Sequence, residues 1–169
     1  MRPAPAKGFT LVELLITLVI LGFLIALALP SFTNSLRSNR VATTSNEVLA
    51  SLSLARSEAI KGIGTAGVCP STDGTSCTSA ATDWSGGWLV WRQERTATGV
   101  VTVGVRYVQA KTKMSVTGPA GGVEFTTQGR SKNGVGSIGL APSDGGTDYS
   151  RCVRVSASGQ ARVVKAACA

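Results

Sequence analysis

Glu13 is the residue whose type and position most clearly require a chemical explanation. It lies within residues 9–29, an apolar run whose other polar side chains are those of Thr10 and Thr17. A carboxylate inside a membrane costs at least ~2–3 kcal/mol, so such a residue is a functional candidate by default. No basic residue within the run can neutralise it. We therefore expect the positive partner of Glu13 to come from outside this segment.

The four cysteines are a second group with recognisable chemistry. They form no Cys-x-x-Cys pair and the chain has no histidine, so the sequence predicts no metal site. An even number of cysteines is typical of disulfides in an oxidising compartment. Three pairings are open, and we favour the two that are local in the sequence, Cys69–Cys77 and Cys152–Cys168. Each would stabilise a small domain by roughly 2–4 kcal/mol.

Catalytic motifs are absent from the sequence. Without histidine, Gly-x-Ser-x-Gly or a phosphate-binding loop, the chain is predicted to be no enzyme and to need no cofactor. The glycine-rich residues 118–122 lack the Lys-Ser/Thr of a P-loop. Residues 143–150 offer too few ligands for calcium. We expect the function to rest on binding or assembly.

Basic residues near the C-terminus form a third candidate site. The net charge of +8 favours contact with phosphates or anionic lipid. Exposed Arg and Lys side chains bind nucleic-acid phosphates through counterion release. The candidate DNA-binding residues are Arg151, Arg154, Arg162 and Lys165. Because alternate residues of a strand share a face, their spacing leaves open which of them are exposed. An ordinary solvated basic surface is the alternative.

A long N-terminal helix is the element that must carry Glu13. Residues 9–30 are long enough, at 1.5 Å per residue, to cross the ~30 Å hydrocarbon core of a membrane. Basic residues before the run favour a cytoplasmic N-terminus and a periplasmic location for the rest. Further on, apolar residues recur at helical spacing at Val48, Leu52, Ala55 and Ala59. An amphipathic continuation of the helix is therefore predicted over 31–62.

The remainder of the chain, 63–169, is predicted to be a periplasmic β domain. Short runs rich in valine are separated by glycine-rich turns, and residues 67–86 read as a long loop clipped by a disulfide. The fold class is therefore α+β. We expect a long N-terminal helix, transmembrane and then amphipathic, packed on a C-terminal antiparallel β domain of two small sheets.

The segment KGFTLVELLITLVILGFLIALALP (7–30) resembles the signal of type IV prepilins and type II secretion pseudopilins. In that family a basic leader ends in glycine and is followed by Phe-Thr-Leu-x-Glu and an apolar helix. The resemblance implies that prepilin peptidase removes residues 1–8 by cleaving after Gly8, and that Phe9 is N-methylated. It implies that Glu13 pairs with the new α-amino group of a neighbouring subunit, since two opposite buried charges offset each other's desolvation.

Three motifs in the second half resemble the GspH/FimT/FimU group of minor pilins and minor pseudopilins. They are Gly-Trp-x-Val-Trp at 87–91, Val-x-Phe-x-x-x-Gly at 123–129 and Val-x-Val-x-x-x-Gly-x-x-Arg-Val at 153–163. The resemblance implies a pilin-like fold and a minor pilin that helps to initiate a type IV pilus and sits at its tip. A GspH-type minor pseudopilin of the type II secretion system is one alternative. A DNA-binding pilus subunit for natural transformation is another.

The DNA-binding alternative depends on a short C-terminal motif. FimT-type members are implied to bind DNA through Gly-Arg-x-Arg, where this chain has Gly-Gln-Ala-Arg at 159–162. Gln160 can donate a hydrogen bond to a phosphate but cannot neutralise it.

The same resemblance implies partners and a location. The partners are other minor and major pilins or pseudopilins, prepilin peptidase and the inner-membrane assembly platform, with DNA as a further candidate. The location is the inner membrane, crossed once with the C-terminal domain in the periplasm, and then the pilus or pseudopilus filament.

Overall fold

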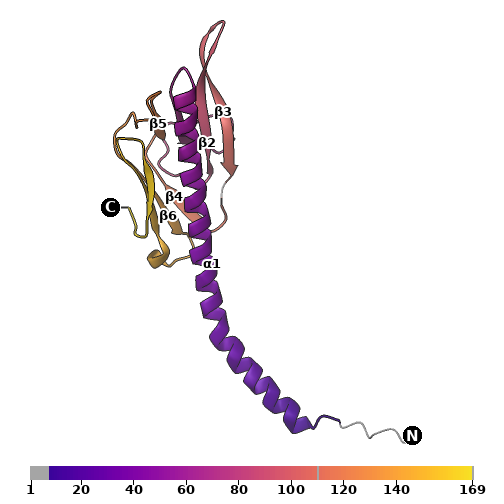
Figure 1. Ribbon diagram of the computed structural model, residues 1–169. Coiled ribbons are helices and arrows are strands. Elements are labelled where there is room, and N and C mark those ends of the chain that lie inside the picture. Colours follow the sequence, from indigo (N-terminus) through magenta and orange to yellow (C-terminus); the bar gives the residue numbers. More distant parts are fainter. Residues whose placement is uncertain (1–7, 110, 169) are drawn as a thin grey trace, which may run out of the picture. The chain divides into compact units, whose positions relative to one another are not determined.

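The computed structural model describes residues 8–109 and 111–168 (Figure 1). The chain divides into two compact units, Met1–Leu36 and Arg37–Ala169. Helix α1 (Leu11–Lys61) begins in the first unit and ends in the second. The predicted leader, 1–8, lies outside the described residues except for Gly8.

The first turn of α1 is capped by Thr10. Its hydroxyl accepts a hydrogen bond from the Glu13 amide at 3.2 Å, which satisfies one of the unpaired N–H groups at the helix start. Farther along, the Thr17 hydroxyl donates to the Leu14 carbonyl at 2.8 Å, so this polar side chain is satisfied locally. An 18-residue window of α1 has a mean hydropathy of 2.8 and is not buried against protein. The helix is therefore long and apolar enough to cross a membrane.

In the second unit, the C-terminal part of α1 supplies one wall of the core. Its buried apolar residues recur at helical spacing, at Val41, Val48, Leu52, Ala55 and Ala59. Two serines on the same stretch, Ser45 and Ser51, are buried. Each hydroxyl donates a hydrogen bond of 2.8 Å to a carbonyl of the preceding helical turn. The helix ends at Lys61, just before Gly62.

Two four-stranded antiparallel sheets complete this unit, and they flank the C-terminal turns of α1 (Figure 1). The first has the order β3-β2-β1-β5, formed by β1 (Ala66–Pro70), β2 (Gly87–Thr96), β3 (Gly99–Gln109) and β5 (Val123–Phe125). The second has the order β4-β6-β7-β8, formed by β4 (Met114–Thr117), β6 (Gly136–Pro142), β7 (Arg151–Val155) and β8 (Ala161–Val164). A short 3-10 helix, η1 (Thr147–Tyr149), precedes β7. The predicted α+β fold class is confirmed.

Strand β1 corrects one expectation, because its residues were expected to belong to a long loop. It pairs with β2 on one side and β5 on the other, and all of its residues are buried. Gly67 and Pro70 are poor strand formers. Burial between two neighbouring strands, a tertiary effect, outweighs that local preference.

The core joins the helix to both sheets. Trp84, Trp88 and Phe125 are its largest fully buried side chains. The indole N–H of Trp88 donates to the Ser51 hydroxyl at 3.0 Å, which ties β2 to α1 by a buried polar contact. All members of the hydrophobic cluster lie between Val41 and Val163. The second unit therefore contains its own complete core.

Candidate assembly segment and basic groove

The predicted assembly residues lie at the exposed start of α1. Phe9 directly follows Gly8, and its side chain is 83% exposed. Glu13 is exposed as well. Among the described residues, no basic group forms an ion pair with the Glu13 carboxylate. This carboxylate is therefore accessible to a cation from another molecule.

Glu13 also has a local role that reasoning from its charge alone missed. Thr10 is the N-cap of α1 and Glu13 is its third helical residue, which is the Thr-x-x-Glu spacing of a capping box. A negative charge in the first turn is also stabilised by the positive end of the helix dipole. The signal was present in the sequence as Thr10-Leu11-Val12-Glu13.

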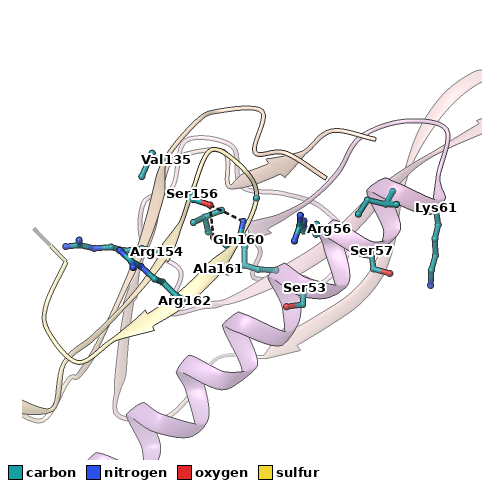
Figure 2. A pocket seen from close by; sticks show the side chains of 14 residues that line it. Ser53, Arg56, Ser57, Lys61, Val135, Arg154, Ser156, Gln160, Ala161 and Arg162 are labelled. Carbon is teal, nitrogen blue, oxygen red and sulfur yellow. Dashed lines mark hydrogen bonds between the residues drawn. The ribbon is translucent and has the colours of Figure 1, made fainter. Parts of the chain in front are cut away.

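The structure brings together two of the four predicted basic residues. Arg154 of β7 and Arg162 of β8 are direct cross-strand partners, so their side chains share a face of the second sheet, as Figure 2 shows. Both are exposed. Arg151 is half-buried and lies on the opposite face from Arg154. That face also carries the core valines of β7. Lys165 is exposed but lies beyond the end of β8.

A groove of about 970 Å³ runs between the last turns of α1 and the β7–β8 hairpin (Figure 2). Apolar lining comes from Leu52, Ile60, Val135, Val155 and Ala161. The charged lining residues are all basic, namely Arg56, Lys61, Arg154 and Arg162. The groove therefore combines an apolar surface with positive charge, a combination that sequence spacing could not reveal because its two sides are far apart in the chain.

Arg56 has a structural task within the groove. Its Nε donates to the Gly129 carbonyl at 2.9 Å and a terminal nitrogen donates to the Ser158 carbonyl at 3.4 Å. The first bond reaches the turn that follows β5, and the second reaches the tip of the β7–β8 hairpin, where Gly159 adopts a φ of +77°. A positive φ strains any side chain other than glycine, so the turn requires this residue.

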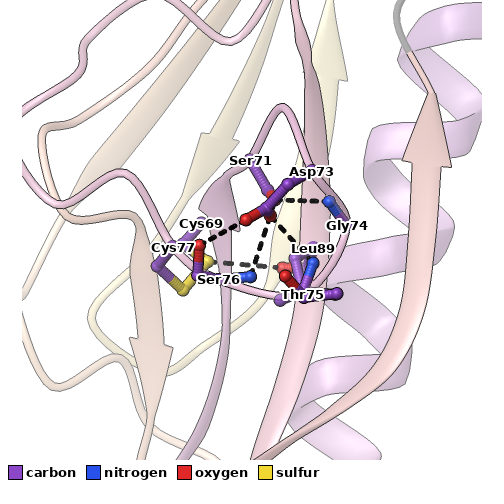
Figure 3. The surroundings of a disulfide bond; sticks show 8 residues. All are labelled: Cys69, Ser71, Asp73, Gly74, Thr75, Ser76, Cys77 and Leu89. Atoms are coloured by element: carbon purple, nitrogen blue, oxygen red, sulfur yellow. Dashed lines mark hydrogen bonds between the residues drawn. A yellow bond between two sulfur atoms is a disulfide. The ribbon is translucent and has the colours of Figure 1, made fainter.

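The first disulfide, Cys69–Cys77, closes a loop organised around Asp73 (Figure 3). The Asp73 carboxylate accepts hydrogen bonds from the amides of Thr75 and Ser76, both at 2.9 Å, and from the Ser76 hydroxyl at 2.7 Å. Those bonds from Ser76 and Thr75 hold the pKa of Asp73 well below its ordinary value. The sequence Asp-Gly-Thr-Ser at 73–76 is typical of such a turn, in which an aspartate accepts hydrogen bonds from amides that follow it.

The second disulfide, Cys152–Cys168, joins β7 to the C-terminal segment. The Cys168 sulfur lies 3.7 Å from the place that a Cβ on Gly139 of β6 would occupy. The segment therefore crosses the outer face of the second sheet, the face that also carries Arg154. Both pairings are the sequence-local ones. Within the described ranges, no cluster of three or more His, Cys, Asp or Glu side chains could hold a metal ion.

Comparison with known protein families found a match for each part of the chain. A family model described as "Type II transport protein GspH" matches residues 44–159, and one described as "Prokaryotic N-terminal methylation motif" matches residues 4–29. No curated protein matches the sequence.

Two crystal structures of the Pseudomonas aeruginosa type IV minor pilin FimU are similar to the structure of this chain. The first has a TM-score of 0.57 at 19% identity, covering 75% of this chain and 89% of that one. The second has a TM-score of 0.54 at 20% identity, covering 73% and 91%. At this identity the likeness establishes a pilin-like fold. The GspH family model matches more than half of the sequence, and the match lies after an N-terminal methylation motif. The chain therefore belongs to the GspH family, as its motifs predicted.

Proposed function

We propose that this chain is a minor pilin that helps to initiate a type IV pilus and sits at its tip. The observation that carries the proposal is the union, in one chain, of a methylation motif at 4–29 and a GspH domain at 44–159. The first part supplies a membrane anchor and filament core. The second presents a folded domain to neighbouring minor pilins.

The chemistry of assembly follows from the start of the mature chain. Cleavage after Gly8 by prepilin peptidase creates an amine on Phe9, which stays cationic when it is methylated. The exposed Glu13 carboxylate of a neighbouring subunit is then its natural partner, because each charge offsets the desolvation of the other. At the start of its helix, each mature subunit carries one cation, the amine of Phe9, and one anion, the carboxylate of Glu13. It can therefore join a neighbour on both sides.

The route to the filament begins in the inner membrane. The apolar window of α1 supports a single membrane crossing. Arg2 and Lys7 favour a cytoplasmic leader, and two disulfides fit a periplasmic domain. In this topology the leader faces the peptidase on the cytoplasmic side. The anchored subunit is then taken up by the inner-membrane assembly platform.

A second candidate is a minor pseudopilin of the type II secretion system. The description of the matching family, a type II transport protein, favours it. The chemistry proposed for Gly8, Phe9 and Glu13 is the same in both systems. Only the filament and its cargo differ.

One experiment separates the two candidates. Surface pili and extracellular type II substrates are measured in a strain that lacks the gene and in a complemented control. Loss of pili with normal secretion supports the minor pilin. Loss of secretion with normal pili supports the pseudopilin. If both are unchanged, both candidates are wrong.

A further inference from the structure

Strand β8 is one of the two edge strands of the second sheet, and it lies beside the groove. The Ser156 amide donates to the Gln160 carbonyl at 2.9 Å and closes the hairpin. Because bonded and non-bonded pairs alternate along an antiparallel ladder, Ala161 and Val163 direct their N–H and C=O groups away from β7. In the part of the chain that the structure describes, these groups make no hydrogen bond. The edge is therefore able to pair with another strand.

The surroundings of this edge suit a polypeptide. Ala161 and Val163 are half-buried and pack against the core. Across the groove, the lining that α1 contributes includes the small side chains of Ser53 and Ser57 (Figure 2). Leu52 and other apolar residues line the space between them. An extended segment would place alternate side chains on this apolar lining.

Charge defines the chemistry of the occupant. Lys61, Arg154 and Arg162 line the groove without an ion-pair partner among residues 8–109 and 111–168. The carboxylates that do form ion pairs are committed elsewhere, at Glu47, Glu58, Glu94, Glu124 and Asp144. No acidic residue lines the groove. An occupant that neutralises these cations must therefore be acidic.

Two other occupants fit less well. A second copy of this chain carries a net charge of +8 and would repel the groove. A nucleic acid offers phosphates to Arg154 and Arg162, but it has no peptide groups to pair with the edge of β8. It would also leave the apolar lining uncovered. An acidic, extended polypeptide satisfies the edge, the lining and the charge together.

We propose that the groove binds an extended acidic segment of a partner subunit, which adds a fifth strand to the second sheet by pairing with β8. Carboxylates on one face of the segment meet Arg154 and Arg162, and apolar residues on its other face meet the groove lining. The identity of the partner as a filament subunit rests on the proposed function. The shape and charge of the site do not.

The test uses the full-length protein in detergent micelles. It is titrated with a peptide of about nine residues that alternates valine with glutamate, with its valine–lysine counterpart, and with a single-stranded DNA oligonucleotide of similar length. We expect only the acidic peptide to bind. Hydrogen exchange of the Ala161 and Val163 amides should slow by roughly tenfold or more on binding, because they gain partners. The Arg162 amide, which already faces β7, should change little.

Variants separate strand addition from general attraction. Val163→Pro removes an outward N–H at a position where an edge strand tolerates proline, and should weaken binding on the order of tenfold. Ala161→Pro serves the same purpose if Val163→Pro lowers the melting temperature too far for the titration. The double variant Arg154→Glu, Arg162→Glu should abolish binding. Arg106→Glu, an exposed arginine on β3 outside the groove, is the charge control and should bind normally.

Three results would overturn the proposal. One is no binding of the acidic peptide. Another is binding that leaves the Ala161 and Val163 amides unprotected and is insensitive to either proline variant. The third is tighter binding of DNA that is lost in the double arginine variant, which would make this face a nucleic-acid site. These measurements use purified protein and test the groove alone. The pilus count in the deletion strain tests the proposed function, so a negative result in one experiment leaves the other proposal unaffected.

Discussion

At the scale of single residues, Glu13 combines two effects that a simple alanine substitution would confuse. It occupies the third helical position after the Thr10 cap, where a carboxylate favours the start of α1. In the proposed filament it also neutralises an amine. A glutamine keeps the size and the hydrogen-bonding capacity of the side chain and removes only the charge.

Glu13→Gln is therefore expected to insert into the membrane normally and to enter filaments poorly. Breaking a buried ion pair costs about 3–5 kcal/mol, so incorporation should fall at least roughly tenfold. The ratio of protein in sheared filaments to protein in membranes, measured by immunoblot, reports this change. Incorporation at the wild-type level would show that capping, not charge pairing, is the role of Glu13.

Gly8 is the residue at which the proposed leader ends. Replacing it by a bulky residue, as in Gly8→Phe, should block the peptidase and leave the leader attached. Intact-mass measurement of membrane-extracted protein distinguishes the two chain lengths and detects the methyl group on Phe9. A mature-length product from this variant would contradict the assigned cleavage site.

Asp73 makes the stability of its loop depend on pH. Its pKa in the folded protein is lowered by hydrogen bonds from Ser76 and Thr75, below the ordinary value of 3.8. The stabilisation is therefore fully present above about pH 4, and it is lost as the pH falls from there toward the folded-state pKa. The melting temperature of Asp73→Asn should lie below that of the wild type at pH 7, and the gap should shrink between about pH 4 and pH 2.

The control for this experiment is Asp148→Asn. In the described part of the chain the Asp148 carboxylate accepts no hydrogen bond, so its removal should leave the melting temperature nearly unchanged at pH 7. If the gap between Asp73→Asn and the wild type is constant from pH 7 to pH 2, the hydrogen-bonded carboxylate is not its cause.

At the scale of elements, the sequence predicts those that depend on periodic spacing, and it does not predict those that depend on contacts between distant parts of the chain. The spacing of Val48, Leu52, Ala55 and Ala59 identified the buried face of α1, because helix periodicity depends only on neighbours in the sequence. Strand β1 was missed, since its glycine and proline favour a loop and only pairing with β2 and β5 makes it a strand. The pairing of Arg154 with Arg162 was not predicted, because alternation within each strand does not give the register between two strands. Their exposure was not predicted either, because it depends on what packs against each face of the sheet.

The contact between α1 and β2 yields a prediction at this scale. Ser51→Ala leaves the buried indole N–H of Trp88 without its acceptor, which should cost about 1–3 kcal/mol of unfolding free energy. Ser53→Ala changes an exposed serine two residues farther along the same helix; it is the matched control and should change stability by less than about 0.5 kcal/mol. Denaturant titration of both variants measures the difference. Equal stabilities would show that the buried bond contributes nothing.

At the scale of the whole molecule, the two units differ in what stabilises them. The second unit, Arg37–Ala169, contains the entire hydrophobic cluster and both disulfides. The first unit exposes its apolar side chains and depends on lipid or on packed helices to cover them.

A fragment that begins at Arg37 is therefore expected to fold in water without detergent. Its melting temperature should lie within a few degrees of the transition of the full-length protein in micelles, because no core contact is removed. Circular dichroism measures both. A fragment that is unfolded at room temperature would show that the first unit contributes to the core.

The order of the cysteines along the chain also governs how the protein matures. Each disulfide joins cysteines that are consecutive in the sequence, with separations of 8 and 16 residues. During the proposed export the N-terminus stays in the cytoplasm, so Cys69 emerges first and Cys77 soon after, well ahead of Cys152. An oxidase that joins thiols as they appear makes the native bonds directly, and no wrongly paired intermediate has to be reshuffled. We expect a strain without a disulfide isomerase to produce this subunit in full, whereas a strain without the oxidase should accumulate it in reduced form.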